Sequence, residues 1–190
     1  MRLAAHSEIE LDRVGAWRLE ERLGAGAFGT VWRARDPSGR VAVVKLLPAP
    51  PGEEIRALAR VRHPSVVEAL GAGTVPVPHL VMSLAPGIPL SAVGPVSEAA
   101  AAGIVAALAD ALAACHRGDV AHGDVKPANV VVEPESLAST PRVTLVDFGL
   151  AGSLGGTPRY ASPERLGGAP ASPAADVFAL GAVALELVGR

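Results

Sequence analysis

The stretch from His122 to Val132 constrains this chain more than any other feature. It reads His-Gly-Asp-Val-Lys-Pro-Ala-Asn-Val-Val-Val, so an aspartate, a lysine and an asparagine stand at set offsets just before an apolar run. A further acid, Asp147, follows the next apolar run. Asp124 and Lys126 could serve one reacting hydroxyl and one phosphate, whereas Asn129 and Asp147 offer the hard oxygen ligands that divalent metals take. These residue types indicate phosphoryl transfer, in which catalysis is mostly positioning and charge neutralisation.

Three motifs resemble those of protein kinases, and they follow that family's order along the chain. The first stretch resembles the catalytic loop, the Asp-Phe-Gly that begins at Asp147 matches the metal-binding motif, and Gly-Thr-Pro-Arg-Tyr-Ala-Ser-Pro-Glu, residues 156–164, is similar to the end of the activation segment. Lys126 and Thr157 have the form of the serine/threonine kinases of bacterial type. The resemblance runs from Trp17 to the last residue. It implies an ATP-dependent enzyme that phosphorylates a serine or threonine hydroxyl of a protein.

The resemblance gives each polar residue of these motifs a role. Asp124 accepts or orients the proton of the substrate hydroxyl, Lys126 neutralises the γ-phosphoryl group, and Thr157 braces both side chains. Asn129 and Asp147 hold the Mg²⁺ that bridges the phosphates. Each residue alone has a structural alternative, such as a turn for Asp124 or a helix cap for Asn129. All of them together, in this order, favour the functional assignment.

The chain before the catalytic loop predicts a small antiparallel sheet. Trp17–Leu23 alternate apolar and polar side chains as a half-buried strand does, and a return strand, residues 30–35, follows a glycine-rich turn. A third strand, residues 40–47, is rich in valine. The turn has the pattern Gly-x-Gly-x-x-Gly, which is weak evidence by itself because dinucleotide-binding folds share it. Here the turn lies between two strands and does not open a helix, which disfavours a dinucleotide fold.

A glycine-rich turn suits a nucleotide, because backbone amides without neighbouring Cβ atoms can approach phosphate oxygens. By the resemblance, Met82 stands at the back of the adenine pocket, and the backbone of Ser83 and Ala85 hydrogen-bonds the base. The residues that the resemblance assigns to ATP are Gly24, Gly26, Phe28, Gly29, Val31, Val43, Lys45, Glu54, Met82, Ser83, Ala85 and Val131.

Lys45 stands inside the apolar third strand. An unpaired buried ammonium costs several kcal/mol, so this lysine needs an anionic partner. The resemblance supplies two, the ATP phosphates and a glutamate of a following helix. That glutamate is Glu54, with Glu53 as the alternative, although the connection to the helix is short and rich in proline. A lysine that extends from a strand end to water is the other reading of Lys45.

The predicted architecture is an α+β fold with two lobes. Residues 1–16 form a leader, residues 17–85 a small lobe of five antiparallel strands and one short helix, and residues 86–190 an incomplete, mainly helical large lobe. Ser97 is the expected N-cap of a long helix to Arg117. Asp176 is expected to head a last helix over Val177–Val188, and the resemblance implies that it bonds the catalytic-loop backbone. One face of the long helix carries a core stripe at helical spacing, namely Ile104, Leu108, Ala111, Leu112 and Cys115.

Composition limits the compartment and the partners. The 190 residues carry a net charge of −2 and no dense basic run, which argues against nucleic acid as a partner. The single cysteine, Cys115, cannot form an internal disulfide and fits a reducing compartment. Asp110 interrupts the most apolar stretch, so no membrane span is expected. The expected localisation is cytoplasmic.

Two departures from the kinase pattern keep alternatives open. Gly123 stands where many kinases have an arginine that pairs with a phosphorylated activation-loop residue. The later helices of the large lobe are absent from this sequence, so the last helix should expose a face for a partner or for self-association. The alternative to an active kinase is therefore a kinase-like module that binds a nucleotide or a partner, or an inactive fragment of a longer kinase.

Overall fold

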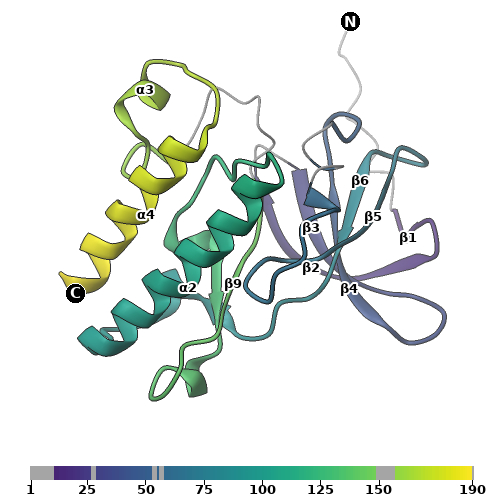
Figure 1. Cartoon of the computed structure of the whole chain (residues 1–190). Helices are drawn as coiled ribbons and strands as arrows, with labels where there is room; N and C mark the ends of the chain where they lie inside the picture. The colour runs from purple at the N-terminus through teal and green to yellow at the C-terminus, as the bar shows by residue number, and fades with distance from the viewer. Residues whose placement is uncertain (1–10, 27–28, 53–54, 56–57, 149–156, 190) are drawn as a thin grey trace, which may run out of the picture.

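Two lobes lie side by side in the computed structural model, a β-sheet on one side and a mainly helical body on the other (Figure 1). The structure describes residues 11–26, 29–52, 55, 58–148 and 157–189. The α+β two-lobed architecture predicted from the sequence is confirmed. The chain passes between the lobes after Met82, the last residue of the sheet lobe's final strand.

The sheet lobe holds one antiparallel sheet with the strand order β1-β2-β3-β4-β6-β5. Its centre is the valine-rich β4, which pairs with β3 and β6 and whose residues are all buried or half-buried. The β2–β3 hairpin carries the glycine-rich turn, as predicted. The strands are β1 (Arg13–Val14), β2 (Trp17–Gly26), β3 (Gly29–Arg35), β4 (Val41–Leu46), β5 (Ala69–Gly73) and β6 (His79–Met82).

The sheet begins earlier than the sequence indicated, since the prediction had five strands in this lobe and none before Trp17. Arg13 and Val14 form β1, which pairs with Arg18 and Trp17. Val14 is fully buried against the outer face of the sheet. A strand of two residues contains no alternation to detect, so only its tertiary pairing reveals it.

The helical lobe is built on two long helices and a small sheet. Helix α2 (Glu98–Arg117) begins at the predicted cap, where Ser97 Oγ accepts a hydrogen bond from the Ala100 amide at 3.2 Å. Its predicted core stripe is buried in full. Helix α4 (Pro173–Val188) packs beside α2. The remaining elements are β7 (Ile88–Pro89), β8 (Val130–Val132), β9 (Val143–Leu145), α3 (Pro163–Leu166), and the 3-10 turns η1 (Leu90–Ala92), η2 (Pro127–Asn129) and η3 (Pro134–Ser136).

Helix α4 starts before the residue predicted to head it. Ser172 caps the helix by accepting from the Ala175 amide at 3.2 Å, and Pro173 occupies the first turn. Proline suits this position because its missing N–H would have no helical partner there. Asp176 therefore lies within the first turn, where a carboxylate also complements the helix dipole. Of the helix expected near Glu54, the described part includes the Ala59 amide, which donates to the Ile55 carbonyl at 3.0 Å.

The two lobes share one apolar core. Leu58, Val66 and Leu80 from the sheet lobe pack in one cluster with Ala111 and Cys115 of α2. The backbone joins the lobes as well, because the Val67 amide donates to Leu145 at 3.0 Å and the Leu145 amide donates to Ser65 at 2.8 Å. The cleft between the lobes therefore has a rigid rear wall.

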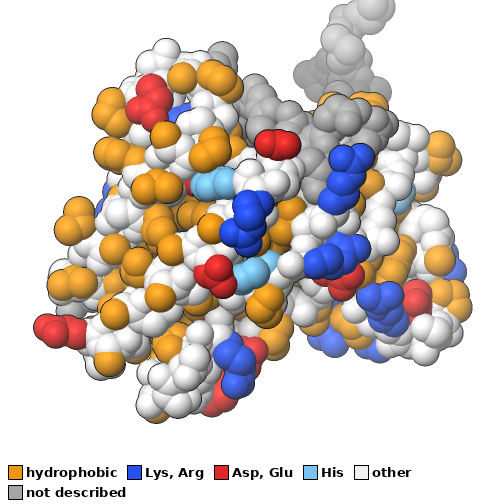
Figure 2. All heavy atoms as spheres, in the orientation of Figure 1, with side chains coloured by type: hydrophobic (Ala, Val, Ile, Leu, Met, Phe, Trp, Pro, Cys, Tyr) orange, Lys and Arg blue, Asp and Glu red, His pale blue; other side chains and the backbone are white. Residues whose placement is uncertain are grey.

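Apolar side chains also lie on the outer surface of the helical lobe. Figure 2 shows hydrophobic side chains over α2 and α4 on this face. The exposed large apolar residues of α4 are Val177, Phe178, Leu185 and Val188. The length and mean hydropathy of α2 would also allow it to cross a membrane. Its buried stripe packs against β9 and α4, as in an ordinary core helix. The length and mean hydropathy of α2 are therefore weak evidence for a membrane span.

The packing of the protein itself requires glycine at position 29, whether or not a ligand is bound. Its φ is +113°, and a Cβ there would lie 1.8 Å from the Leu46 carbonyl oxygen. We expect Gly29→Ala to lower the free energy of unfolding by about 2 kcal/mol or more, because it adds a backbone clash to a left-handed φ. Urea unfolding measures this. Gly26→Ala is the matched control, since a Cβ there meets no atom within 4 Å. Equal free energies of unfolding for the two variants would contradict the packing requirement at Gly29.

Candidate active site

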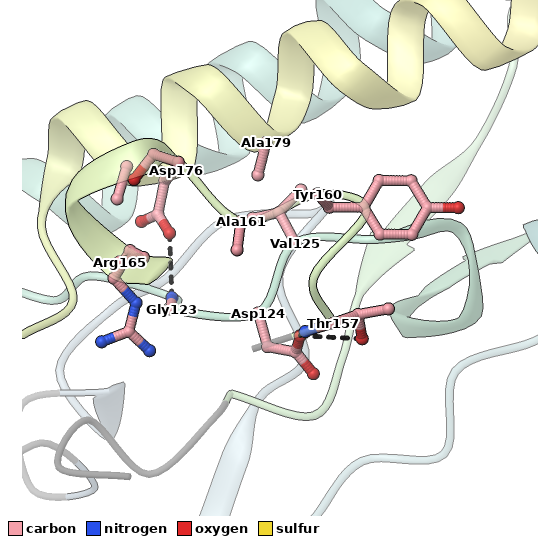
Figure 3. Close-up of a pocket in the computed structure, with 11 residues that line it drawn as sticks. Gly123, Asp124, Val125, Thr157, Tyr160, Ala161, Arg165, Asp176 and Ala179 are labelled. Atoms are coloured by element: carbon pink, nitrogen blue, oxygen red, sulfur yellow. Dashed lines mark hydrogen bonds between the residues drawn. The ribbon is translucent and has the colours of Figure 1, made fainter. Parts of the chain in front are cut away.

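The three residues predicted to act on the substrate hydroxyl form one cluster. Lys126 Nζ lies 2.6 Å from Asp124 Oδ2 and 2.9 Å from Thr157 Oγ1. The Thr157 amide donates to Asp124 Oδ1 at 3.2 Å (Figure 3). Asp124 is thereby oriented from two sides, and its side chain is only 11% exposed. An ammonium beside a half-buried carboxylate can orient a hydroxyl and oppose phosphate charge at once.

Asp176 anchors the loop that carries this cluster. Its two carboxylate oxygens accept from the backbone amides of His122 and Gly123, each at 2.8 Å. His116, in the last turn of α2, adds a contact of 2.9 Å from Nε2. Asp176 is 1% exposed, and these donors compensate for the burial of its charge. Asp176 was predicted to bond this loop, whereas His116 was not predicted, and only its place at the end of a helix could have suggested it.

His122 is held as a neutral imidazole. The Asp124 amide donates to His122 Nδ1 at 3.2 Å, so the proton resides on Nε2, which lies 3.0 Å from the Val146 carbonyl. Complete burial lowers the pKa of His122 below its usual value. Its ring packs at 4.6 Å from that of Phe148. His122 thus ties the catalytic loop to the segment that contains Asp147.

A cleft of about 270 Å³ lies between the lobes, beside this cluster. Its volume is near the lower end of the range for small-molecule sites. Eight of the predicted ATP residues line it, namely Gly24, Val31, Val43, Lys45, Met82, Ser83, Ala85 and Val131. Both predicted metal ligands, Asn129 and Asp147, line it too.

Of the other four predicted ATP residues, two lie in the described part of the chain. Gly26 and Gly29 lie in the hairpin above the cleft but outside its lining. Phe28 and Glu54, with the alternative Glu53, lie outside the described residues. The prediction missed Leu23, Val67, Leu84, Ala128 and Val146, which line the cleft through plain apolar contact. In the sequence, four of the five stand next to a predicted site residue, whereas Val67 has no such signal.

Lys45 is buried and forms an ion pair with Asp147 across the cleft. The predicted pairing of Lys45 with Glu54 lies outside the described residues. Asp147 has a φ of +56°, which is unusual for a residue with a side chain. The strained backbone directs its carboxylate into the cleft beside Lys45.

The residues present fit a magnesium ion that also binds phosphate. Asn129 Nδ2 donates to the Asp124 carbonyl at 2.8 Å and to Asp124 Oδ2 at 3.2 Å, so its amide oxygen is left as the acceptor. Asp147 supplies a carboxylate to the same cleft. Across the described ranges, no three His, Cys, Asp or Glu side chains gather into a metal cluster. Two oxygen donors without a full protein cage are typical of Mg²⁺ that completes its shell with phosphate and water.

A further contact holds the segment after Thr157. Tyr160 donates its hydroxyl proton to Glu186 of α4 at 2.6 Å, and Arg159 lies 3.4 Å from the same carboxylate. These residues were not identified from the sequence. The contact fixes the end of the segment on α4, and so it supports the position of Thr157 beside Asp124.

This architecture, with a glycine hairpin, an interlobe cleft and an Asp-Lys-Thr cluster beside it, is that of a protein kinase domain. The family model for the protein kinase domain matches residues 17–190. The chain belongs to the protein kinase family.

Bacterial serine/threonine kinases are among its relatives. The chain is 35% identical to the probable serine/threonine-protein kinase PkwA of Thermomonospora curvata, over 94% of this chain and 27% of that protein. It is 33% identical to Pkn1 of Myxococcus xanthus, over 93% of this chain and 29% of that protein. It is 36% identical to PkaA of Streptomyces coelicolor, over 90% of this chain and 38% of that protein. The chain thus spans well under half the length of these relatives.

The burial of His122 predicts a loss of stability in acid. Because its pKa is lowered in the fold, the unfolded chain binds more protons as the pH falls below about 6.5, and folding becomes less favourable. Each further pH unit should cost up to about 1.4 kcal/mol until the folded-state pKa is reached. Urea unfolding of the parent and of His122→Asn between pH 7 and 5 measures the effect. We expect a shallower pH dependence in the variant; parallel curves would contradict this.

Proposed function

We propose that this chain is the catalytic domain of an ATP-dependent serine/threonine protein kinase, which transfers the γ-phosphoryl group of ATP to a protein hydroxyl. The observation that carries the proposal is the contact of Lys126 with both Asp124 and Thr157, immediately beside a cleft that contains Lys45 and Asp147. The names of the relatives support the serine/threonine class.

Each residue then has a defined task. Asp124 orients the acceptor hydroxyl and takes its proton, and Lys126 opposes the charge on the transferring phosphoryl group. Lys45 binds the phosphates, and Val43, Met82 and the backbone of Ser83 and Ala85 form the adenine site. Mg²⁺, when bound through Asn129 and Asp147, neutralises phosphate charge. Thr157 holds the side chains of Asp124 and Lys126 in position.

A kinase-like binding module is the second candidate. The ion pair of Lys45 with Asp147 favours it, because this contact engages the carboxylate that a metal would need. A module of this kind would bind a nucleotide or a protein without appreciable transfer. Binding and transfer therefore have to be measured separately.

Magnesium and ATP together should raise the thermal midpoint of the chain. At a ligand concentration of 100 times Kd the gain is about 2.7 kcal/mol, or about 5–10 °C for a chain of this size. We expect Asp147→Asn to remove the magnesium-dependent part of the shift, because it removes a charged oxygen ligand. A folded parent that shows no shift would exclude both the kinase and the nucleotide-binding module.

Asp124→Asn separates the two candidates. The asparagine keeps an oxygen for the Thr157 amide but cannot take a proton. Transfer from radiolabelled ATP to a serine or threonine peptide should fall by about 10²- to 10⁴-fold, while the Mg²⁺-ATP thermal shift is kept. A parent that binds Mg²⁺-ATP but transfers no more phosphate than the variant would be a binding module.

The compartment and partners are part of the proposal. We place the chain in the cytoplasm, where ATP is abundant and the thiol of the buried Cys115 stays reduced. A protein is the substrate, and a net charge of −2 does not favour nucleic acid. The exposed apolar face of α4 supports association with a partner or a second copy. Sedimentation velocity tests self-association, which a monomer at all concentrations would contradict.

A further inference from the structure

A cavity of about 170 Å³ lies where β1 meets the start of β2 and the end of β3, at the edge of the sheet lobe far from the helical lobe (Figure 1). Among the described residues, it shares no lining residue with the nucleotide cleft. Its volume is below the roughly 300–1,000 Å³ that small-molecule sites usually have, so it suits one chemical group and not a whole metabolite. The cavity is lined by Arg13, Ala16, Arg18, Arg35, Asp36 and Pro37.

The three arginines of this cavity form one row across three neighbouring strands. Arg13 of β1 is the cross-strand partner of Arg18 in β2, and Arg18 is in turn the partner of Arg35 in β3. Residues that stand directly opposite each other in an antiparallel pair project from the same face, so the three side chains share one face of the sheet. The neighbouring Val14 and Ala34 belong to the opposite face and are fully buried. Like charges in opposed positions destabilise a sheet, and here two such pairs follow each other.

Glu20 holds two of these arginines side by side. Its Oε1 atom accepts from Arg18 Nη2 at 3.0 Å and from Arg35 Nε at 2.9 Å. The Arg35 guanidinium is fixed further because its Nη1 donates to the Gly39 carbonyl at 2.9 Å. One carboxylate thus orients two guanidinium groups but can neutralise only one of their two charges.

The remaining charges of the cavity leave an excess at Arg13. Across the described part of the chain, the Arg13 side chain forms no ion pair and no hydrogen bond. Asp36 turns its Oδ1 into its own turn, where it accepts from the amides of Ser38 and Arg40 at 2.9 and 3.0 Å. Three guanidinium groups therefore stand against the carboxylates of Asp36 and Glu20. Placing an arginine without an acceptor opposite another arginine lowers the stability of the fold, and an anionic ligand would reverse this cost.

We propose that Arg13, Arg18 and Arg35 bind the phosphate group of a phosphorylated serine or threonine side chain of a protein. A phosphate carries more acceptor oxygens and more charge than a carboxylate, and the planar fork of arginine donates two parallel hydrogen bonds to it. A cluster of arginines is a general docking site for such a group. The cavity admits the phosphate while the peptide that carries it stays outside. The site lies apart from the nucleotide cleft, so its test requires neither ATP nor phosphoryl transfer.

Fluorescence anisotropy of labelled peptides tests the site. Three otherwise neutral peptides carry phosphoserine, serine or glutamate at one position. We expect the parent to bind the phosphoserine peptide at least tenfold more tightly than the serine peptide, with the glutamate peptide between them and inorganic phosphate as a competitor. Arg13→Gln should reduce this preference about fivefold, and Arg13→Lys should keep part of it, because an ammonium retains the charge without the fork. Arg60→Gln is the matched control, since Arg60 is exposed in the same lobe outside the cavity lining.

Urea unfolding guards against a loss of binding by misfolding. Because Arg13 faces a like charge without an acceptor, Arg13→Gln should unfold at an equal or higher urea concentration than the parent in chloride buffer. Inorganic phosphate at the same ionic strength should then stabilise the parent and Arg60→Gln more than Arg13→Gln, since a ligand that binds the native state stabilises it. The general effect of phosphate on protein surfaces is shared by all three proteins, so the difference reports the site.

Two results overturn the proposal. One is equal binding of the phosphoserine and serine peptides by the parent, and the other is a phosphoserine preference that Arg13→Gln retains in full. Vesicles that contain phosphatidic acid, whose headgroup is also a phosphate monoester, are the third probe. Binding to these vesicles that depends on Arg13, without a phosphoserine preference, would assign the row to a lipid headgroup and would overturn a protein ligand.

Discussion

The rest of the site depends on the hydrogen bonds that the buried carboxylate of Asp176 accepts. Removing a carboxylate from water costs several kcal/mol unless donors surround it. Here the amides of His122 and Gly123 and the ring of His116 supply those donors. Because the donors come from the catalytic loop and from α2, the charge can be buried only when α4, α2 and the loop are assembled together. Asp124 reaches its position through this assembly.

The catalytic loop and the cleft share side chains, so the lobes are coupled where chemistry would occur. Asn129 binds the Asp124 carbonyl through its amide nitrogen and faces the cleft, and His122 joins the loop to the Val146 carbonyl. A core that includes residues of both lobes keeps the rear of the cleft rigid. The groups proposed to act on ATP and on the acceptor are thereby held by one continuous network, as preorganised catalysis requires.

Sequence reasoning recovered the features that short patterns encode. The α2 cap at Ser97, the apolar stripe of α2 and the β2–β3 hairpin all follow from local periodicity and capping chemistry, and the structure has each of them. The two-residue β1 escaped because it is too short to show an alternating pattern, and the early start of α4 is set by Ser172 and Pro173, local signals that the prediction did not use. By contrast, Tyr160 and Glu186 are separated by 26 residues, and nothing in the local pattern of either one indicates the other.

The sequence by itself determined which chemical groups the chain carries and their order, from the glycine hairpin through Lys45 and Asp124 to Asp147 and Thr157. That order was enough to indicate the family and the two lobes. Only the tertiary structure decided which groups meet: Lys45 with Asp147, His116 with Asp176, and Arg13 with Arg18 and Arg35. The reason is physical. Local propensities act over a few residues, whereas the burial of a charge depends on donors that folding brings in from remote segments.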